Sequence, residues 1–140
     1  MSTERTHGPT VATAMTVSPV VVSEDEAIAG VAELLAGYEI SGLPVVDRGD
    51  HLVGVISDTD LVRLQGAAIP WTGWHGLIVR DLMTYPAQTI EEDASLDDAA
   101  RLMTTLGVHR LVVVDEERAP IGIISKSDLV REIADACDDC

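Results

Sequence analysis

Two short segments of the sequence carry hydroxyl and carboxylate side chains in the same order. Ser57-Asp58-Thr59-Asp60 follows an apolar stretch, and so does Ser125-Lys126-Ser127-Asp128. The apolar spacing after each segment predicts a helix, which Ser125 or Ser127 could cap in the second case. A strand that runs into a helix N-terminus presents free N–H groups, which suits a ligand with several hydroxyls and a phosphate. The alternative is that both segments are only helix caps.

The two segments belong to a longer internal repeat. Asp60 and Asp128 hold the same place in it, 68 residues apart. Other pairs at the same distance are Met15-Thr16 with Met83-Thr84, Val45-Val46-Asp47 with Val113-Val114-Asp115, and Gly54 with Gly122. A fixed period of this kind indicates a duplicated structural unit. We interpret the chain as a tandem duplication.

Within each copy the hydrophobic periodicity predicts the order β-α-β-β-α. In the first copy we expect a strand Val20–Val22, a helix begun by a Ser23/Glu26 capping box and ended by Gly37, strands Leu43–Val46 and Leu52–Ile56 around a turn at 47–50, and a helix from about Asp58. In the second copy we expect a strand Gln88–Ile90, a helix that buries Leu96, Ala99, Leu102 and Met103, strands Leu111–Val114 and Ile121–Ile124, and a final helix. The fold class is therefore α+β. Because one such unit buries little surface alone, the two should pack together around a pseudo-twofold axis.

Charge and composition exclude several classes of function. The chain has 140 residues, a net charge of −15 and 46% hydrophobic residues. A strongly negative protein with four aromatic residues lacks the cations and the stacking platform that nucleic acids require. Its apolar runs are too short to span a bilayer, and its N-terminus lacks the apolar region of a signal peptide. We expect a cytoplasmic protein that binds neither nucleic acid nor membrane.

The duplication also suggests boundaries. We expect a flexible N-terminal segment at 1–10, a first repeat at 11–66, a tryptophan-containing linker at 67–78, a second repeat at 79–135 and an acidic tail at 136–140. Trp71 and Trp74 of the linker are expected to cover the core or a dimer interface. Cys137 and Cys140 form a C-x-x-C pair, which supplies only two metal ligands and is flanked by acids that disfavour a thiolate. We interpret the tail as frayed, with a metal- or redox-responsive role as the alternative.

The repeated pattern resembles a known family. The Met-Thr pair before the first strand, the run Leu43-Pro44-Val45-Val46-Asp47 and the ending Gly54-x-Ile56-Ser57-x-x-Asp60-Leu61 resemble CBS domains, named for cystathionine β-synthase. Two in tandem resemble the CBS pair, or Bateman module, of stand-alone bacterial-type CBS proteins. The resemblance covers about Val11 to Asp135. The run Gly107 to Asp115 is also similar to the γ subunit of AMP-activated protein kinase.

The resemblance implies two clefts, each shared by both repeats, that bind adenosine-containing ligands. Asp60 and Asp128 match the carboxylate that accepts hydrogen bonds from both ribose hydroxyls, a role that suits an acceptor-only group. One cleft would combine Thr16, Val20, Ile40 and Ser41 with Ser125, Lys126, Ser127 and Asp128. The other would combine Thr84, Gln88, Val108, His109 and Arg110 with Ser57, Thr59 and Asp60.

The two clefts should be unequal. His109-Arg110 resembles the phosphate-contacting pair of the kinase subunit, and a planar guanidinium is suited to phosphate. In the first copy Ser41-Gly42 replaces that pair, and Asp58 replaces Lys126. Both changes remove positive charge. We therefore expect a phosphate-bearing ligand where Arg110 and Lys126 reach.

These features favour a regulatory, energy-sensing module over an enzyme. CBS pairs occur inside inosine monophosphate dehydrogenases, but this chain has no room for a catalytic barrel and shows no catalytic triad, Walker loop or metal-ligand set. The ligand would be AMP, ADP, ATP or a related adenosyl compound such as S-adenosylmethionine or NAD, with no required cofactor. We expect a homodimer that signals to a regulated protein partner through its conformation. The alternatives are a structural dimerisation module with empty clefts and the metal- or redox-responsive module.

Overall fold

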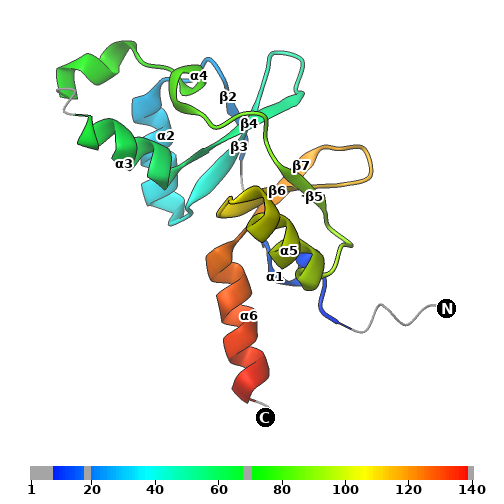
Figure 1. The fold of residues 1–140 in the computed structure, drawn as a ribbon. Coiled ribbons are helices and arrows are strands. Elements are labelled where there is room, and N and C mark those ends of the chain that lie inside the picture. Colours follow the sequence, from blue (N-terminus) through cyan, green and yellow to red (C-terminus); the bar gives the residue numbers. More distant parts are fainter. Residues whose placement is uncertain (1–7, 18–19, 68–70, 139–140) are drawn as a thin grey trace. The chain divides into compact units, whose positions relative to one another are not determined.

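The structure is a computed structural model that describes residues 8–17, 20–67 and 71–138, without the side chains of residues 71, 72 and 138. The chain forms two compact units. One contains residues 18–88, and the other contains residues 1–17 together with residues 89–140. Both combine helices with a sheet (Figure 1), which confirms the α+β class and the two repeats.

The unit of residues 18–88 is built on a three-stranded sheet. Its elements are β2 (Val22–Ser23), α2 (Ile28–Tyr38), β3 (Gly42–Val46), β4 (Leu52–Ser57), α3 (Asp58–Gly66), the 3-10 helix η2 (Trp71–Gly76) and α4 (Val79–Leu82). The strand order is β2-β3-β4, with β2 parallel and β4 antiparallel to β3. Ile28 of α2, Leu43 of β3, Ile56 of β4 and Val79 of α4 are fully buried in one core, which holds the helices on the sheet.

The other unit is built on a four-stranded sheet. Its elements are α1 (Val11–Ala14), β1 (Thr16–Val17), β5 (Thr89–Glu91), α5 (Leu96–Leu106), β6 (Arg110–Val114), β7 (Pro120–Ser125) and α6 (Lys126–Asp138). The strand order is β1-β7-β6-β5. Its core contains Val11 of α1, Ala99 of α5, Leu111 of β6 and Ile124 of β7. The expected helix and three main strands of the second copy therefore form as predicted.

Each unit forms the same backbone hydrogen bonds within itself, at equivalent positions. The N–H of Val79 donates to the carbonyl of Glu26 at 2.9 Å, and the N–H of Val11 donates to the carbonyl of Ala94 at 2.8 Å. In the sheets, Leu43 pairs with Ile56 as Leu111 pairs with Ile124. Every one of these pairs keeps the offset of 68 residues. The duplication seen in the sequence is thus also a duplication of hydrogen bonding.

Each unit takes its short helix and Met-Thr pair from the beginning of the other sequence repeat. Thr84 exchanges backbone hydrogen bonds with Val55 at 3.0 and 2.9 Å, and Thr16 pairs with Ile123. A Cβ atom at Gly54 would lie 2.7 Å from the carbonyl oxygen of Thr84. Glycine is therefore required for this close backbone approach. The compact units and the sequence repeats are different divisions of the chain.

Helix α2 differs from expectation at both ends. Ser23 does not cap it, because its hydroxyl accepts from the N–H of Asp25 at 3.1 Å and the helix begins only at Ile28. The N–H of Ile28 donates instead to the carbonyl of Leu77 at 3.1 Å, so a neighbouring segment replaces the side-chain cap. The helix continues past Gly37, and Glu39 takes the left-handed conformation that ends it, at φ 55°. The first strand also lies later than expected, at Val22–Ser23.

The segments outside the repeats are partly described. Residues 1–7 lie outside the described residues, but the carbonyl of Pro9 accepts from the N–H of Leu96 at 3.2 Å. Trp74 of η2 is half-buried against the core of residues 18–88, as expected for a core-covering side chain, whereas the Trp71 side chain is not described. No helix among those described has both the length and the apolar character of a membrane span.

Candidate functional site

Asp60 takes part in the N-terminal cap of α3. Ser57 is the N-cap residue, and its hydroxyl accepts from the N–H of Asp60 at 3.3 Å. In return, Asp60 Oδ2 accepts from the N–H of Ser57 at 2.9 Å and from its hydroxyl at 3.1 Å. This reciprocal arrangement is a capping box with Asp in place of the usual Glu. This segment therefore caps α3, and the cap uses only one of the two carboxylate oxygens of Asp60.

Asp128 repeats this geometry at the N-terminus of α6. Its Oδ2 accepts from the N–H of Ser125 at 2.8 Å and from the Ser125 hydroxyl at 3.1 Å. The N–H of Asp128 donates to the same hydroxyl at 3.3 Å. Ser125 is thus the capping residue, while Ser127 lies exposed in the first turn of the helix.

The second oxygen of each aspartate faces weaker or more exposed partners. Asp60 Oδ1 lies 3.4 Å from Arg63 Nη1 and 3.4 Å from the hydroxyl of Thr84. Asp128 Oδ1 lies 3.0 Å from Arg131 Nη1. The two carboxylates are only 3% and 4% exposed, so each is a buried charge with a fixed orientation. Bonds as long as 3.4 Å are weak, and they leave the outer oxygen of Asp60 available to a better donor.

Arg63 and Arg131 have functional positions that were missed from the sequence. The signal was present, because Arg follows Asp by three residues in both copies and residues three apart share a helix face. The Arg63 and Arg131 side chains are largely exposed, at 71% and 64%. They partly balance the charges of the buried carboxylates from the solvent side.

Each unit contains part of each predicted site. Besides Asp60, the unit of residues 18–88 contains Val20, Ile40, Ser41, Ser57, Thr59, Thr84 and Gln88. The carbonyl of Ser41 accepts from the N–H of Asp58 at 2.9 Å, and Gly42 pairs with Ser57. The loop before β3 is therefore held against the start of α3. Val20 and Ile40 are partly buried against the core beneath it.

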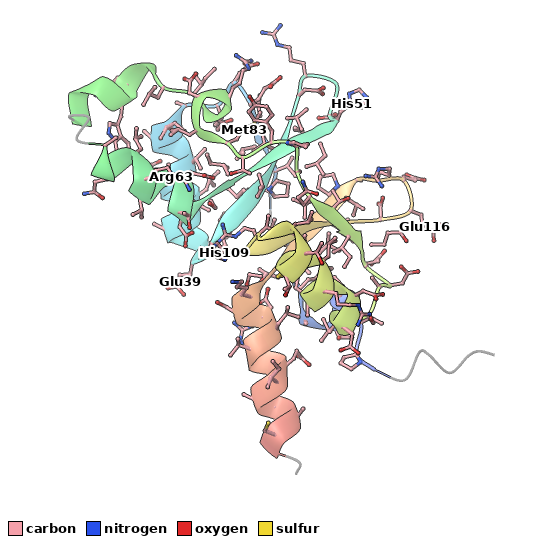
Figure 2. The ribbon with its side chains drawn as sticks, viewed as in Figure 1. Glu39, His51, Arg63, Met83, His109 and Glu116 are labelled. Carbon is pink, nitrogen blue, oxygen red and sulfur yellow. The ribbon has the colours of Figure 1, made fainter. Side chains whose placement is uncertain are left out.

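The other unit has the same construction around Asp128. It contains Thr16, Val108, His109, Arg110, Ser125, Lys126 and Ser127. The carbonyl of His109 accepts from the N–H of Lys126 at 3.0 Å, and Arg110 pairs with Ser125 across β6 and β7. His109, labelled in Figure 2, is exposed in the loop before β6. The predicted phosphate-contacting residues thus lie next to a capping box in the same unit.

Comparison with protein families settles the assignment. The CBS domain family matches residues 11–66 and 79–135, which is more than half of the chain. The chain belongs to the CBS-domain family. It contains two CBS repeats, as the resemblance implied.

Solved structures of CBS-domain proteins share the fold. The structure of CBSX2 in complex with AMP matches with a TM-score of 0.71 and 34% identity, over 92% of this chain and 98% of that one. The CBS domain pair of protein MJ0100, in complex with 5′-methylthioadenosine and S-adenosyl-L-methionine, matches with a TM-score of 0.76 and 25% identity, over 89% of this chain and 99% of that one. Both of these CBS pairs hold adenosine-containing molecules.

Curated relatives include longer proteins. The chain is 34% identical over 112 residues to an inosine-5′-monophosphate dehydrogenase of Methanocaldococcus jannaschii, covering 80% of this chain and 21% of that enzyme. It is 31% identical over 135 residues to the chloroplastic CBSX2 of Arabidopsis thaliana, covering 79% of this chain and 57% of that protein. The chain thus spans about a fifth of the dehydrogenase and just over half of CBSX2. The similarity to the dehydrogenase is confined to CBS repeats.

No metal centre is formed within the described residues, where no three His, Cys, Asp or Glu side chains converge suitably. Cys137 is exposed near the end of α6, and Cys140 lies outside the part of the chain that the structure describes. The metal- or redox-responsive alternative stays a prediction.

Proposed function

We propose that this CBS pair is a regulatory module that binds an adenine nucleotide and has no catalytic activity of its own. The supporting observation is the pair of buried, capped carboxylates, Asp60 and Asp128, each oriented by a serine and each with its outer oxygen Oδ1 turned away from the cap. The AMP complex of CBSX2, 34% identical to this chain, supports an adenosine ligand.

The different partners of Oδ1 and Oδ2 in each aspartate suit the recognition of a ribose. Oδ2 is held by two donors of the capping serine, so the carboxylate plane is fixed before a ligand arrives. A ribose diol offers two adjacent hydroxyl donors, and a carboxylate can accept both. At Asp60 the ligand would replace two contacts of 3.4 Å, so little existing hydrogen bonding is lost. Preorganisation of this kind lowers the cost of binding.

For the remaining site residues we propose the roles that the family resemblance implies. Val20, Ile40 and Val108 would line apolar slots for adenine, with Ser41 and Gln88 at their edges. Arg110 and Lys126, together with His109, would bind phosphate, because a guanidinium forms charge-assisted hydrogen bonds to phosphate oxygens. Thr16, Thr84, Ser57, Thr59 and Ser127 would contribute hydroxyls.

AMP is the nucleotide we favour first. The net charge of −15 opposes the binding of anions, and each added phosphate must overcome it with the few cations available. ADP, ATP, S-adenosylmethionine and NAD share the adenosine part and are the next candidates. Occupancy would be transmitted through the mutual orientation of the two repeats, in a homodimer or to a protein partner. These features and a cytoplasmic location are part of the proposal.

The test is a thermal-shift and calorimetric screen of the five ligands against the wild type, Asp60→Asn and Asp128→Asn. A ligand at a hundred times its dissociation constant stabilises the folded state by about 2.7 kcal/mol. Asp98→Asn is a matched control, since Ser95, Asp98 and Arg101 repeat the spacing of Ser57, Asp60 and Arg63 at the start of α5. A shift that persists in the control but disappears in one site variant supports the proposal.

The other outcome favours the structural alternative. If none of the five ligands shifts the melting temperature or gives binding heat, the capping boxes serve only α3 and α6. The module would then act through dimerisation alone, which sedimentation of the same samples would measure.

A further inference from the structure

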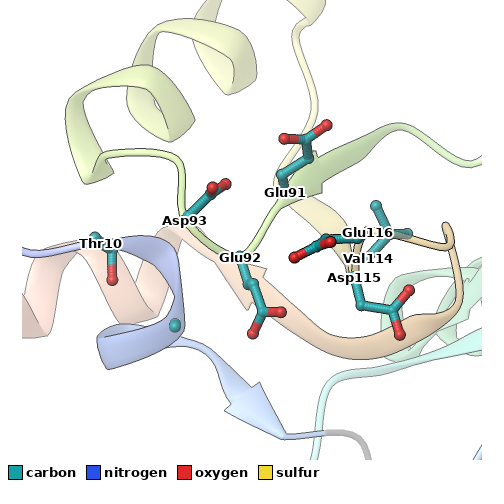
Figure 3. A pocket seen from close by; sticks show the side chains of 8 residues that line it. Thr10, Glu91, Glu92, Asp93, Val114, Asp115 and Glu116 are labelled. Carbon is teal, nitrogen blue, oxygen red and sulfur yellow. The ribbon is translucent and has the colours of Figure 1, made fainter.

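A strongly acidic cavity lies in the unit of residues 1–17 and 89–140, on a different part of it from the capping box of Asp128. It has a volume of about 470 Å³. Its lining consists of Thr10, Ala12, Glu91, Glu92, Asp93, Val114, Asp115 and Glu116. Figure 3 shows the carboxylates around the hollow, from the end of β5, the loop that follows it and the turn after β6. Five of its eight residues are acidic, so we call it the acidic cavity.

The equivalent place in the unit of residues 18–88 contains two arginines. Arg80 of α4 pairs with Glu24, Nε to Oε1 at 3.4 Å, and also with Asp25. Arg48 of the β3–β4 turn pairs with Asp25, Nε to Oδ2 at 3.4 Å. The hydrogen bond to Glu24 is the main cause that raises the pKa of Arg80 above its usual value. Guanidinium groups thus bind this acidic loop in the first copy.

The two places correspond in backbone geometry as well as in sequence. The N–H of Arg80 donates to the carbonyl of Glu24 at 2.9 Å, and the N–H of Ala12 donates to the carbonyl of Glu92 at 2.9 Å. Ala12 therefore stands where Arg80 stands in the first copy.

The same correspondence holds in the strand-connecting turns. Asp47 Oδ1 accepts from the N–H of Gly49 at 2.8 Å, and Asp115 Oδ1 accepts from the N–H of Glu117 at 2.9 Å. The residue between acceptor and donor is Arg48 in one turn and Glu116 in the other. Figure 2 shows His51 and Glu116 on these two turns.

The second copy thus keeps the acids and has lost both cations. Across residues 8–17, 20–67 and 71–138, no arginine, lysine or histidine forms a salt bridge with any of the five cavity carboxylates. Arg118 lies in the same turn as Asp115 and Glu116, and its N–H donates to the carbonyl of Asp115 at 3.0 Å, but its Nη2 donates to the hydroxyl of Thr89 at 3.4 Å. The charges repel one another, and truncation of the arginine position to Ala12 leaves space beside them.

We propose that the acidic cavity binds an arginine side chain of a partner protein. The partner would supply in trans the guanidinium that Arg80 supplies within the first copy. Two observations besides the acidic cluster carry this inference: the open volume beside Ala12, and the guanidinium bound to Glu24 and Asp25 at the corresponding place. A planar fork of N–H donors can bridge two carboxylates, which a lysine ammonium does less well. The inference does not depend on nucleotide binding.

The direct test is a titration of the ¹⁵N-labelled full chain with the blocked peptide acetyl-Gly-Arg-Gly-amide, followed by amide chemical shifts. We expect shifts at Glu92, Asp93, Asp115 and Glu116, saturating in the millimolar range, because exposed carboxylates contribute little singly. Affinity should fall at least about fivefold between low salt and 1 M salt. Acetyl-Gly-Gln-Gly-amide, the neutral control, should leave these amides unchanged.

A variant that restores the first copy's arrangement is the second arm. Ala12→Arg with Glu116→Arg should fill the cavity, abolish the peptide-induced shifts and raise the melting temperature. Arg80→Ala with Arg48→Glu, the converse change, should create a new peptide-responsive site at Glu24 and Asp25.

Four results would overturn the proposal. They are no shifts at the cavity, peptide shifts that survive in the double arginine variant, a stronger response to Mg²⁺ or Ca²⁺ than to the peptide, and shifts of the cavity amides on Arg5→Gln substitution without peptide. The last would show that the chain's own N-terminal arginine is the occupant.

Discussion

The Asp60 carboxylate holds the Ser57 backbone N–H at 2.9 Å through one oxygen, while its other oxygen lies 3.4 Å from the Thr84 hydroxyl. One side chain therefore joins the start of α3 to the Met83-Thr84 segment, which arrives from beyond the linker. The carboxylate is only 3% exposed, so this orientation is part of the core of its unit. A ligand that uses the outer oxygen would be sensed by both segments.

Ser125→Ala should destabilise the protein by about 1 kcal/mol, because the first turn of α6 loses its cap and Asp128 loses a hydroxyl donor. Ser127→Ala should change stability by less than about 0.5 kcal/mol, since that hydroxyl is exposed and does not cap. Urea unfolding of the two variants measures the difference. Equal effects would mean that the cap is not where the geometry places it.

Arg110→Gln should weaken AMP binding about tenfold while leaving adenosine binding unchanged, because a hydrogen bond to a charged phosphate contributes about 1.5 kcal/mol or more. Lys126→Gln should act in the same direction. Calorimetry with AMP and adenosine in parallel separates the phosphate contribution from that of the nucleoside. Equal losses for both ligands would place these side chains away from the phosphate.

Gly122→Ala should destabilise the protein by about 1–3 kcal/mol, because the new Cβ would lie 2.7 Å from the carbonyl oxygen of Thr16. Gly54→Ala should do the same against Thr84. Gly37→Ala is the matched control, since Gly37 lies within α2 with open space around it. That change should stabilise by up to about 1 kcal/mol. Thermal unfolding of the three variants tests the close approach of Thr16 to Gly122 and of Thr84 to Gly54.

Acid should remove a contribution that the N-terminus of α5 makes to the stability of the folded protein. Arg101 Nη2 donates to Asp98 Oδ1 at 2.8 Å, and this hydrogen bond, followed by the one to Ser95, lowers the pKa of Asp98 below 3.8. The unfolded chain therefore binds a proton more readily than the folded one. This stabilising contribution is fully present above the pKa that Asp98 has in the unfolded chain. It is lost as the pH falls through the pKa that Asp98 has in the folded protein.

The measurement is urea unfolding from pH 5 to the lowest pH at which the chain stays folded, for the wild type and for Asp98→Asn. The variant should lose less stability than the wild type over this range. Asp47 provides a second case, since the N–H of His51 holds its pKa below the usual value. An unchanged slope in Asp98→Asn would contradict the expected linkage.

Local patterns decided which parts of the fold could be predicted from sequence. The strands β3, β4, β6 and β7 are short apolar runs bounded by turn residues, and their burial leaves little choice of conformation. The caps at Ser57 and Ser125 depend only on residues three apart. Because each pattern occurs twice at one offset, the second copy corroborated the first. The beginning of α2 was misplaced because Leu77, distant in sequence, satisfies the N–H that a side-chain cap would otherwise take. Its end was misplaced because Glu39, rather than Gly37, takes the left-handed conformation that ends the helix.

The sequence by itself determined the duplication, the α+β class and the two aspartates at helix N-termini, since these follow from spacing along the chain. The family followed from the resemblance of the repeated motifs to CBS domains. Only the tertiary structure decided that α1 and β1 join the unit of residues 89–140, and that α4 joins the unit of residues 18–88. That choice depends on the fit of the Thr16 and Thr84 carbonyls against Gly122 and Gly54. The tertiary structure also decided that Arg80 neutralises one acidic loop while Ala12 leaves the other open. Backbone fit and charge pairing between segments far apart in sequence are set when the chain packs, and no local pattern encodes them.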